Sequence, residues 1–312
     1  MMNLNTYQKT AITTVAAVIF LIFVGGLVRA AGAGLGCPDW PKCFGLWIPP
    51  TNAADLPAGF DAAQFNVFKT WTEYINRLIG AVIGLLITAT FVLSFRYRKK
   101  TPSVFYSSMA AFFMVIFQGW LGGQVVKSGL NEWLITIHMV LAMAIMTTLL
   151  YATFKATEEH WRVSVDTHTR RWLFGLGMLL FMFSMIQLIF GTEVREAVDR
   201  VSRGASTIPR EQWLTSIGSI DEWHRTFSWT VFLSGLALTV ATYRLTNAYF
   251  LKKLAAGIII VIISQILLGA GLYYLGMPPA YQVLHLVGVA FLICAEFVFL
   301  LVVRPQKNPA EG

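Results

Sequence analysis

Eight long apolar segments constrain the fold of this chain more than any other feature of the sequence. A helix that crosses a bilayer core needs about 20 mostly apolar residues, and each segment meets that length. Of the 312 residues, 56% are hydrophobic and 13% are charged, which excludes an ordinary soluble globule. The sequence predicts an all-α integral membrane protein with eight transmembrane helices, at about residues 10–31, 72–95, 103–126, 133–154, 172–191, 223–243, 254–275 and 281–303.

The basic residues show how these helices should be oriented. The formal net charge is +8, but more than half of the Lys and Arg residues lie at the N-terminus, after the second, fourth and sixth segments, and in the C-terminal tail. Lys and Arg accumulate in cytoplasmic loops. We therefore expect a multi-pass protein of the cell membrane with both termini cytoplasmic, and we interpret the positive charge as an orientation signal rather than a nucleic-acid site.

Three motifs recur in the same order in the two parts of the chain. GGLVR (25–29) matches GTEVR (191–195), and EYINR (73–77) matches DEWHR (221–225). Gln118 precedes Leu-Gly and His138 as Gln265 precedes Leu-Gly and His285. The repeat predicts two homologous four-helix halves, residues 1–160 and 165–312, related by a pseudo-two-fold axis along the membrane normal. The halves should be parallel, and the first segment should be a retained helix rather than a cleaved signal.

Histidines mark the outer ends of three segments. His138, His224 and His285 lie near the starts of the fourth, sixth and eighth segments, and Asn76 occupies the matching position in the second. Ionisable groups inside membrane helices are costly and usually functional. Each histidine could alternatively be an ordinary hydrogen-bonded residue between helices, although three matched positions make that less favourable.

His224 and His285 belong to the same half and enter the membrane at the same depth. Two imidazoles on facing helices of a bundle can bind a haem iron from both sides. A closed zinc site is disfavoured because it needs four ligands. In the first half a haem would be bound from one side only, by His138, because the amide of Asn76 is a poor iron ligand.

Acidic and basic residues flank these positions. Glu73 lies one turn before Asn76, so both project from the same helix face. Arg77 and Arg225 have two alternatives: each can pair with the acid four residues earlier on its own helix, or bind carboxylates such as haem propionates.

The loops on the outer side carry two further features. Cys37 and Cys43 lie together in GCPDWPKC, where they could form a structural disulfide or a redox-active thiol pair. Cys294, within the last segment, is expected to be a packing residue. Residues 192–213 have charges at helical spacing and predict a short helix over the outer mouth of the bundle.

Taken together, these residues resemble the haem A synthase family. The most specific parts are GGLVRAAGAGLGCPDWPKC, the pair EYINR and DEWHR, and the spaced histidines, and the resemblance spans nearly all of the chain. It implies a membrane oxidoreductase that converts the C8 methyl group of haem O to a formyl group, giving haem A for the terminal oxidase. Asn76 departs from the family, in which many members have histidine there.

The resemblance also implies roles for residues. Haem b would be the cofactor of the C-terminal half, bound by His224 and His285. Haem O would be the substrate in the N-terminal half, at His138 with Glu73 assisting the oxidation and Asn76 beside it. The Cys37–Cys43 pair would lie in the outer loop, and both haem sites would face outward. Implied partners are the bilayer, haem O synthase and an electron donor, with a homo-oligomer left open.

Three other functions stay open at this point. A b-type electron-transfer cytochrome would relay electrons through both halves, although Asn76 argues against paired ligands in the first. A haem-binding paralogue without conversion activity would fit the missing histidine. A transporter would fit the duplicated bundle, although the polar residues gather at the outer end rather than at the membrane midplane.

Overall fold

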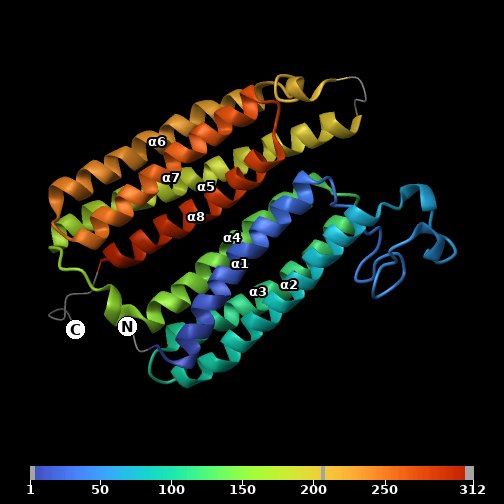
Figure 1. Cartoon of the computed structure of the whole chain (residues 1–312). Helices are drawn as coiled ribbons and strands as arrows, with labels where there is room; N and C mark the ends of the chain where they lie inside the picture. Colours follow the sequence, from blue (N-terminus) through green and yellow to red (C-terminus); the bar gives the residue numbers. More distant parts are fainter. Residues whose placement is uncertain (1–3, 205–207, 306–312) are drawn as a thin grey trace. The chain divides into compact units, whose positions relative to one another are not determined.

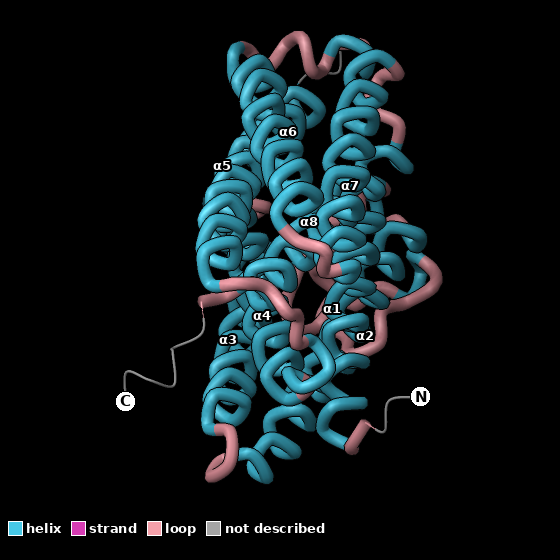
Figure 2. Tube along the Cα trace, turned by 90° about the vertical axis from the view of Figure 1, so that its left-hand side faces the viewer, coloured by secondary structure: helices cyan, strands magenta, loops and turns pink. Residues whose placement is uncertain are grey.

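The described part of the chain consists of helices joined by turns and loops. The computed structural model describes residues 4–204 and 208–305, in which there are eight α-helices, five short 3-10 helices and no strand (Figure 2). All eight α-helices are long and apolar enough to cross a membrane, which confirms the predicted fold class. They are α1 (Thr6–Ala30), α2 (Val67–Ser94), α3 (Pro102–Lys127), α4 (Glu132–Ala156), α5 (Thr167–Gly204), α6 (Ser219–Leu245), α7 (Tyr249–Tyr274) and α8 (Pro279–Val303).

Several helices begin a few residues before the apolar segments because their first turns are polar. Asn5 caps α1 in a capping box: its side chain accepts a hydrogen bond from the backbone N–H of Gln8 at 3.1 Å, and the Gln8 side chain accepts from the backbone N–H of Asn5 at 2.8 Å. Asn66 caps α2. Pro102 and Pro279 lie in the first turns of α3 and α8, where proline's missing N–H has no intrahelical partner to lose.

The chain divides into two compact units. Unit 1 comprises the described residues up to Ala156 together with Gln282–Val287, and unit 2 comprises Thr157–Tyr281 with the described residues from Gly288 onward. In unit 1, α1 and α3 each pack against both α2 and α4, so α2 lies diagonally across the bundle from α4 (Figure 1). In unit 2, α6 packs against α5 and α7, and α8 approaches α5 where Ser184 donates to Glu296 at 2.7 Å. Each unit can therefore hold a site in its core.

The same turn ends α3 and α7. Gly129 and Leu130 both have positive φ angles, 65° and 65°, and Gly276 and Met277 have 67° and 59°. The backbone N–H of Leu130 donates to the carbonyl of Val125 at 2.9 Å, and that of Met277 closes an equivalent bond of 3.0 Å. Glycine favours this left-handed conformation at a helix end. The repeated turn is consistent with two homologous halves, whose pseudo-two-fold relation stays a prediction.

The prediction of a separate short helix over residues 192–213 is wrong. α5 continues without interruption from Thr167 to Gly204, a helix of 38 residues. The stretch after Gly191 contains neither a proline nor a turn signal up to Gly204, and charges four residues apart support the helix: Arg195 and Asp199 are 3.7 Å apart. A single glycine does not end a helix when the residues after it favour helix.

Large apolar side chains are exposed along the spans. Leu85, Ile260 and Leu267 are 69%, 64% and 65% exposed. A soluble protein rarely exposes this many large apolar residues, whereas in a bilayer they contact lipid tails. The exposed faces thus support the membrane-spanning interpretation.

Candidate functional site

The loop between α1 and α2 is closed by a disulfide. Cys37 and Cys43 are bonded and almost completely buried. A redox-active pair is also bonded in its oxidised form, so the choice between a structural disulfide and a redox-active pair stays a prediction. Phe44 packs beside the disulfide, with Phe60 and Phe65 against it. The loop thus has a small apolar core of its own beyond the ends of the helices (Figure 1).

Glu73 on α2 anchors this loop. Its carboxylate accepts a hydrogen bond from the backbone N–H of Cys37 at 2.9 Å and from Nε of Arg77 at 3.1 Å, and it forms an ion pair with the Arg77 guanidinium. Glu73 is 4% exposed. A buried carboxylate is stabilised when charge and hydrogen bonds compensate for its lost hydration. The Glu73 carboxylate is therefore directed at the disulfide loop.

Arg77 completes the anchor. Besides its bonds to Glu73, its guanidinium donates to the backbone carbonyls of Asp39 at 2.7 Å, Lys42 at 2.9 Å and Cys37 at 3.3 Å. A guanidinium has five N–H donors, and these contacts occupy them. Of the two alternatives predicted from the sequence, the one in which Arg77 pairs with the acid four residues earlier on its own helix is therefore present. Arg77 could bind a haem propionate only if one of these bonds opened.

Asn76 and His138 lie on the two diagonal helices of unit 1. Asn76 is on α2, one turn after Glu73, and its buried Oδ1 has no hydrogen-bond partner among the described residues. His138 is on α4 and half-buried, and its backbone carbonyl accepts a hydrogen bond from Nε2 of Gln118 on α3 at 3.0 Å. The site roles of Glu73, Asn76 and His138 stay predictions.

Unit 2 repeats this arrangement around His224. His224 is half-buried on α6, and its backbone carbonyl accepts a hydrogen bond from Nε2 of Gln187 on α5 at 2.9 Å. The next residue, Arg225, donates to Asp221 at 2.8 Å and lies over the ring of Tyr273, 4.6 Å from its centroid. The Arg225 side chain is 50% exposed, so unlike Arg77 it can reach a further carboxylate. Binding of a haem propionate by Arg225 stays a prediction.

His285 lies in the second turn of α8, within the segment Gln282–Val287 that groups with unit 1. The pairing of His285 with His224 about one iron stays a prediction.

Two of the candidate histidine rings pack against a glycine on the preceding helix, and their donor atoms are of a kind that haem iron accepts. Gly122 and Gly191 face the imidazoles so closely that a Cβ on either would lie 3.3 Å from Cε1 of His138 or 3.2 Å from Cε1 of His224. Glycine thus leaves the space in which each ring stands. Imidazole nitrogen is the usual axial ligand of haem iron, and one or two such ligands suffice. Among residues 4–204 and 208–305, no three His, Cys, Asp or Glu side chains gather as a metal-ligand cluster.

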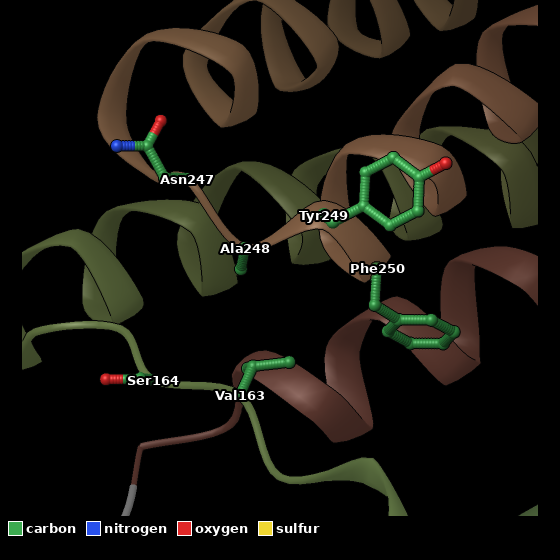
Figure 3. Close-up of a pocket in the computed structure, with 6 residues that line it drawn as sticks. All are labelled: Val163, Ser164, Asn247, Ala248, Tyr249 and Phe250. Carbon is green, nitrogen blue, oxygen red and sulfur yellow. The ribbon is translucent and has the colours of Figure 1, made fainter.

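An open hollow of about 420 Å³ lies elsewhere in unit 2, at the opposite end of α6 from His224 (Figure 3). It contains no histidine, cysteine or carboxylate, so its chemistry does not suit an iron ligand. Its lining residues are Val163, Ser164, Asn247, Ala248, Tyr249 and Phe250.

Two kinds of residue at the site were not predicted from the sequence. Asp39 accepts hydrogen bonds from the backbone N–H groups of Phe44 at 2.6 Å and Gly45 at 2.9 Å, which shapes the disulfide loop. Gln187 contacts the His224 backbone and was not singled out. Its spacing to Gly191 equals that of Gln118 to Gly122, and this repeated spacing was the available signal.

Known proteins are similar to this chain over most of its length. Residues 8–297 match the family described as cytochrome oxidase assembly protein, COX15-CtaA. A protein of Shewanella oneidensis named heme A synthase is 24% identical over 309 residues, covering 90% of this chain and 91% of its own. One of the same name from Caulobacter sp. strain K31 is 25% identical over 324 residues, covering 93% and 94%. The chain therefore belongs to the cytochrome oxidase assembly protein family.

Proposed function

We propose that this protein is a haem A synthase that oxidises the C8 methyl group of haem O to a formyl group. The observation that carries the proposal is the repeated histidine environment. The rings of His138 in unit 1 and His224 in unit 2 each pack against a glycine on the preceding helix, and a glutamine of that helix donates to the backbone carbonyl of the same histidine. The relatives named heme A synthase match nearly the whole chain, which supports the choice of reaction over other haem chemistry.

The two sequence halves would have different tasks. In the C-terminal half, residues 165–312, His224 and His285 would hold haem b, with Arg225 near a propionate. In the N-terminal half, residues 1–160, His138 would hold the substrate haem O from one side. Haem b, when bound, supplies one-electron transfer. Because the Asn76 amide would not compete for iron, one face of the substrate site would stay accessible for exchange of haem O and haem A.

Glu73 would act at the rim of the substrate site. Converting a methyl to a formyl group adds one oxygen atom and removes hydrogen from the reacting carbon in two two-electron steps. The electrons would be relayed by haem b, and a positioned carboxylate is a suitable group to accept a proton from the reacting carbon. The ion pair with Arg77 holds the Glu73 oxygens in one geometry. The disulfide loop, bonded to the same carboxylate, would limit water access above the site.

The membrane setting follows from the same proposal. Both termini would be cytoplasmic and both haem sites would face the outer side of the cell membrane. Haem O synthase would supply the substrate, and a membrane electron carrier would exchange electrons with haem b. A homo-oligomer is compatible with this arrangement.

The test is to co-express the chain with haem O synthase and to analyse extracted haems by chromatography. Haem A accumulation together with haem b in the purified protein is the expected result. Haem b without haem A would favour the b-type cytochrome or a paralogue that binds without converting. Purified protein without haem would overturn the proposal, and a transporter would then be the remaining reading.

A further inference from the structure

Two glutamines make the same contact in the two units. Nε2 of Gln118 donates to the backbone carbonyl of His138 at 3.0 Å, and Nε2 of Gln187 donates to that of His224 at 2.9 Å. In both cases the glutamine lies on the helix that precedes the histidine helix and packs against it. A helix carbonyl already accepts an intrahelical bond, so this extra donor connects two helices at the histidine itself.

A glycine follows each glutamine by one turn. Gly122 and Gly191 lie four residues after Gln118 and Gln187 and face the ring of the same histidine. Residues four apart share one helix face. On each preceding helix, the glutamine therefore donates to the histidine backbone, and the glycine, which has no side chain, leaves room for the imidazole ring.

The spacing Gln-x-x-x-Gly occurs a third time, at Gln265 and Gly269 before His285. Gln265 approaches Gly288 on α8, three residues after His285, so closely that a Cβ there would collide with the amide. At the fourth matching position, in α1, Leu21 replaces the glutamine before Gly25. This is the position whose partner on the next helix is Asn76 rather than histidine.

The fourth position also differs in its packing. A Cβ on Gly25 would meet no atom of the described residues within 4 Å, whereas one on Gly191 would meet the His224 ring. Glutamine therefore occurs where a histidine follows and is missing where it does not. A general role in helix packing would not distinguish these positions.

We propose that Gln118 and Gln187 are positioning residues for the axial histidines His138 and His224. Each fixes the depth and rotation of the histidine helix through its backbone, so that the imidazole enters the slot left by Gly122 or Gly191 in the orientation that an iron requires. The inference rests on the proposed haem function. Removing a group that hydrogen-bonds to a metal-ligand residue commonly lowers the metal affinity by 10- to 100-fold.

The test uses full-length protein purified with its haem. Gln187→Met keeps the size of the side chain and removes the donor. Gln8→Met is the matched control, because Nε2 of Gln8 also donates to a helix carbonyl, that of Ala156 at 2.5 Å, with no histidine involved. The readouts are the electron paramagnetic resonance spectrum of the low-spin haem and the rate at which haem passes to apomyoglobin.

We expect Gln187→Met to shift the low-spin signal and to release haem roughly tenfold faster, while Gln8→Met leaves both unchanged. Gly191→Ala independently tests the space that Gly191 leaves for the His224 ring, and it replaces Gln187→Met if that variant does not fold. It should shift the same low-spin signal. Unchanged spectra and release rates in the Gln187 and Gly191 variants, or equal changes in the Gln8 control, would overturn the inference and leave the proposed function intact. Wild-type protein without haem would overturn both.

Discussion

Glu73 accepts a hydrogen bond from the backbone N–H of Cys37 at 2.9 Å, which joins α2 to the disulfide loop one turn before Asn76. The loop is therefore attached to the same helix face that carries the polar residues of the candidate substrate site. Any change in the charge of Glu73 acts on two features together, the geometry of the loop and the chemistry beneath it.

Replacing Glu73 by glutamine separates these two effects. The amide oxygen can still accept from Cys37, but it cannot take up a proton or pair as an anion with Arg77. Since a positioned acid–base group commonly contributes at least a hundredfold to a rate, we expect haem A yield to fall by roughly that factor while the haem b spectrum is retained. Haem extraction from co-expressing cells measures the yield, and a normal yield would refute the assigned role.

Asp221 provides the control in the other half. It pairs with Arg225 at 2.8 Å, in the same i,i+4 geometry, and this pair lies within α6. Asp221→Ala should therefore leave the protease resistance of residues 36–66 unchanged, whereas Glu73→Ala, which removes the acceptor of the Cys37 N–H, should lower it. Equal loss of resistance in these two alanine variants would show that the loop depends on general stability rather than on Glu73.

Reducing the disulfide should loosen the loop without unfolding the helices. Cys37 and Cys43 are six residues apart, and closing so short a loop stabilises a fold by about 2 kcal/mol. Cys43→Ser should make residues 36–66 more sensitive to protease and lower the thermal midpoint slightly, while Cys294→Ser leaves the loop resistant. Identical digestion patterns of wild type and Cys43→Ser would contradict this expectation.

The two matched arginines should differ in their effect on stability. Arg77 is 15% exposed and binds Glu73 and three loop carbonyls, so Arg77→Ala leaves a buried carboxylate uncompensated, a loss of about 3–5 kcal/mol. The Arg225 side chain is 50% exposed, and pairs near a surface contribute about 1 kcal/mol or less. Thermal unfolding in one detergent should show the larger decrease for Arg77→Ala; equal decreases would contradict the assigned anchor.

The fold could be predicted to a large extent because a bilayer imposes one length and one composition on every span. The ends of the helices could be predicted less accurately, because the polar caps Asn5 and Asn66 start helices α1 and α2 several residues before the apolar segments begin. The continuity of α5 beyond Gly191 was missed for a related reason: the charged residues after Gly191 were predicted to be helical, but the apolar segment ends at Gly191, and hydropathy does not show whether the helix continues past that point.

The candidate site was predictable only in its residue types. Repeated motifs identified His138, His224 and Asn76, but the direction of a side chain depends on contacts between distant segments. The bonds from Arg77 to the loop carbonyls and from Gln187 to the His224 backbone cross 35 or more residues. Spacing along one helix can single out a residue such as Gln187, but it does not show which distant group that residue contacts.

The missing histidine offers a final prediction. Asn76→His alone adds an imidazole opposite a helix that has Leu21 where α5 has Gln187, so nothing holds the new ring at the depth that an iron requires. The double variant Leu21→Gln with Asn76→His reproduces both features of unit 2, and Gly25 already leaves space for the ring. We expect the double variant, more than Asn76→His alone, to add a low-spin haem signal and to slow haem A release, because a second axial ligand strengthens binding of the haem. The spectra of the two purified variants measure the difference. Equal low-spin signals in both would show that the glutamine is not needed, whereas a stronger signal in the double variant means that the open face at Asn76 depends on both residues.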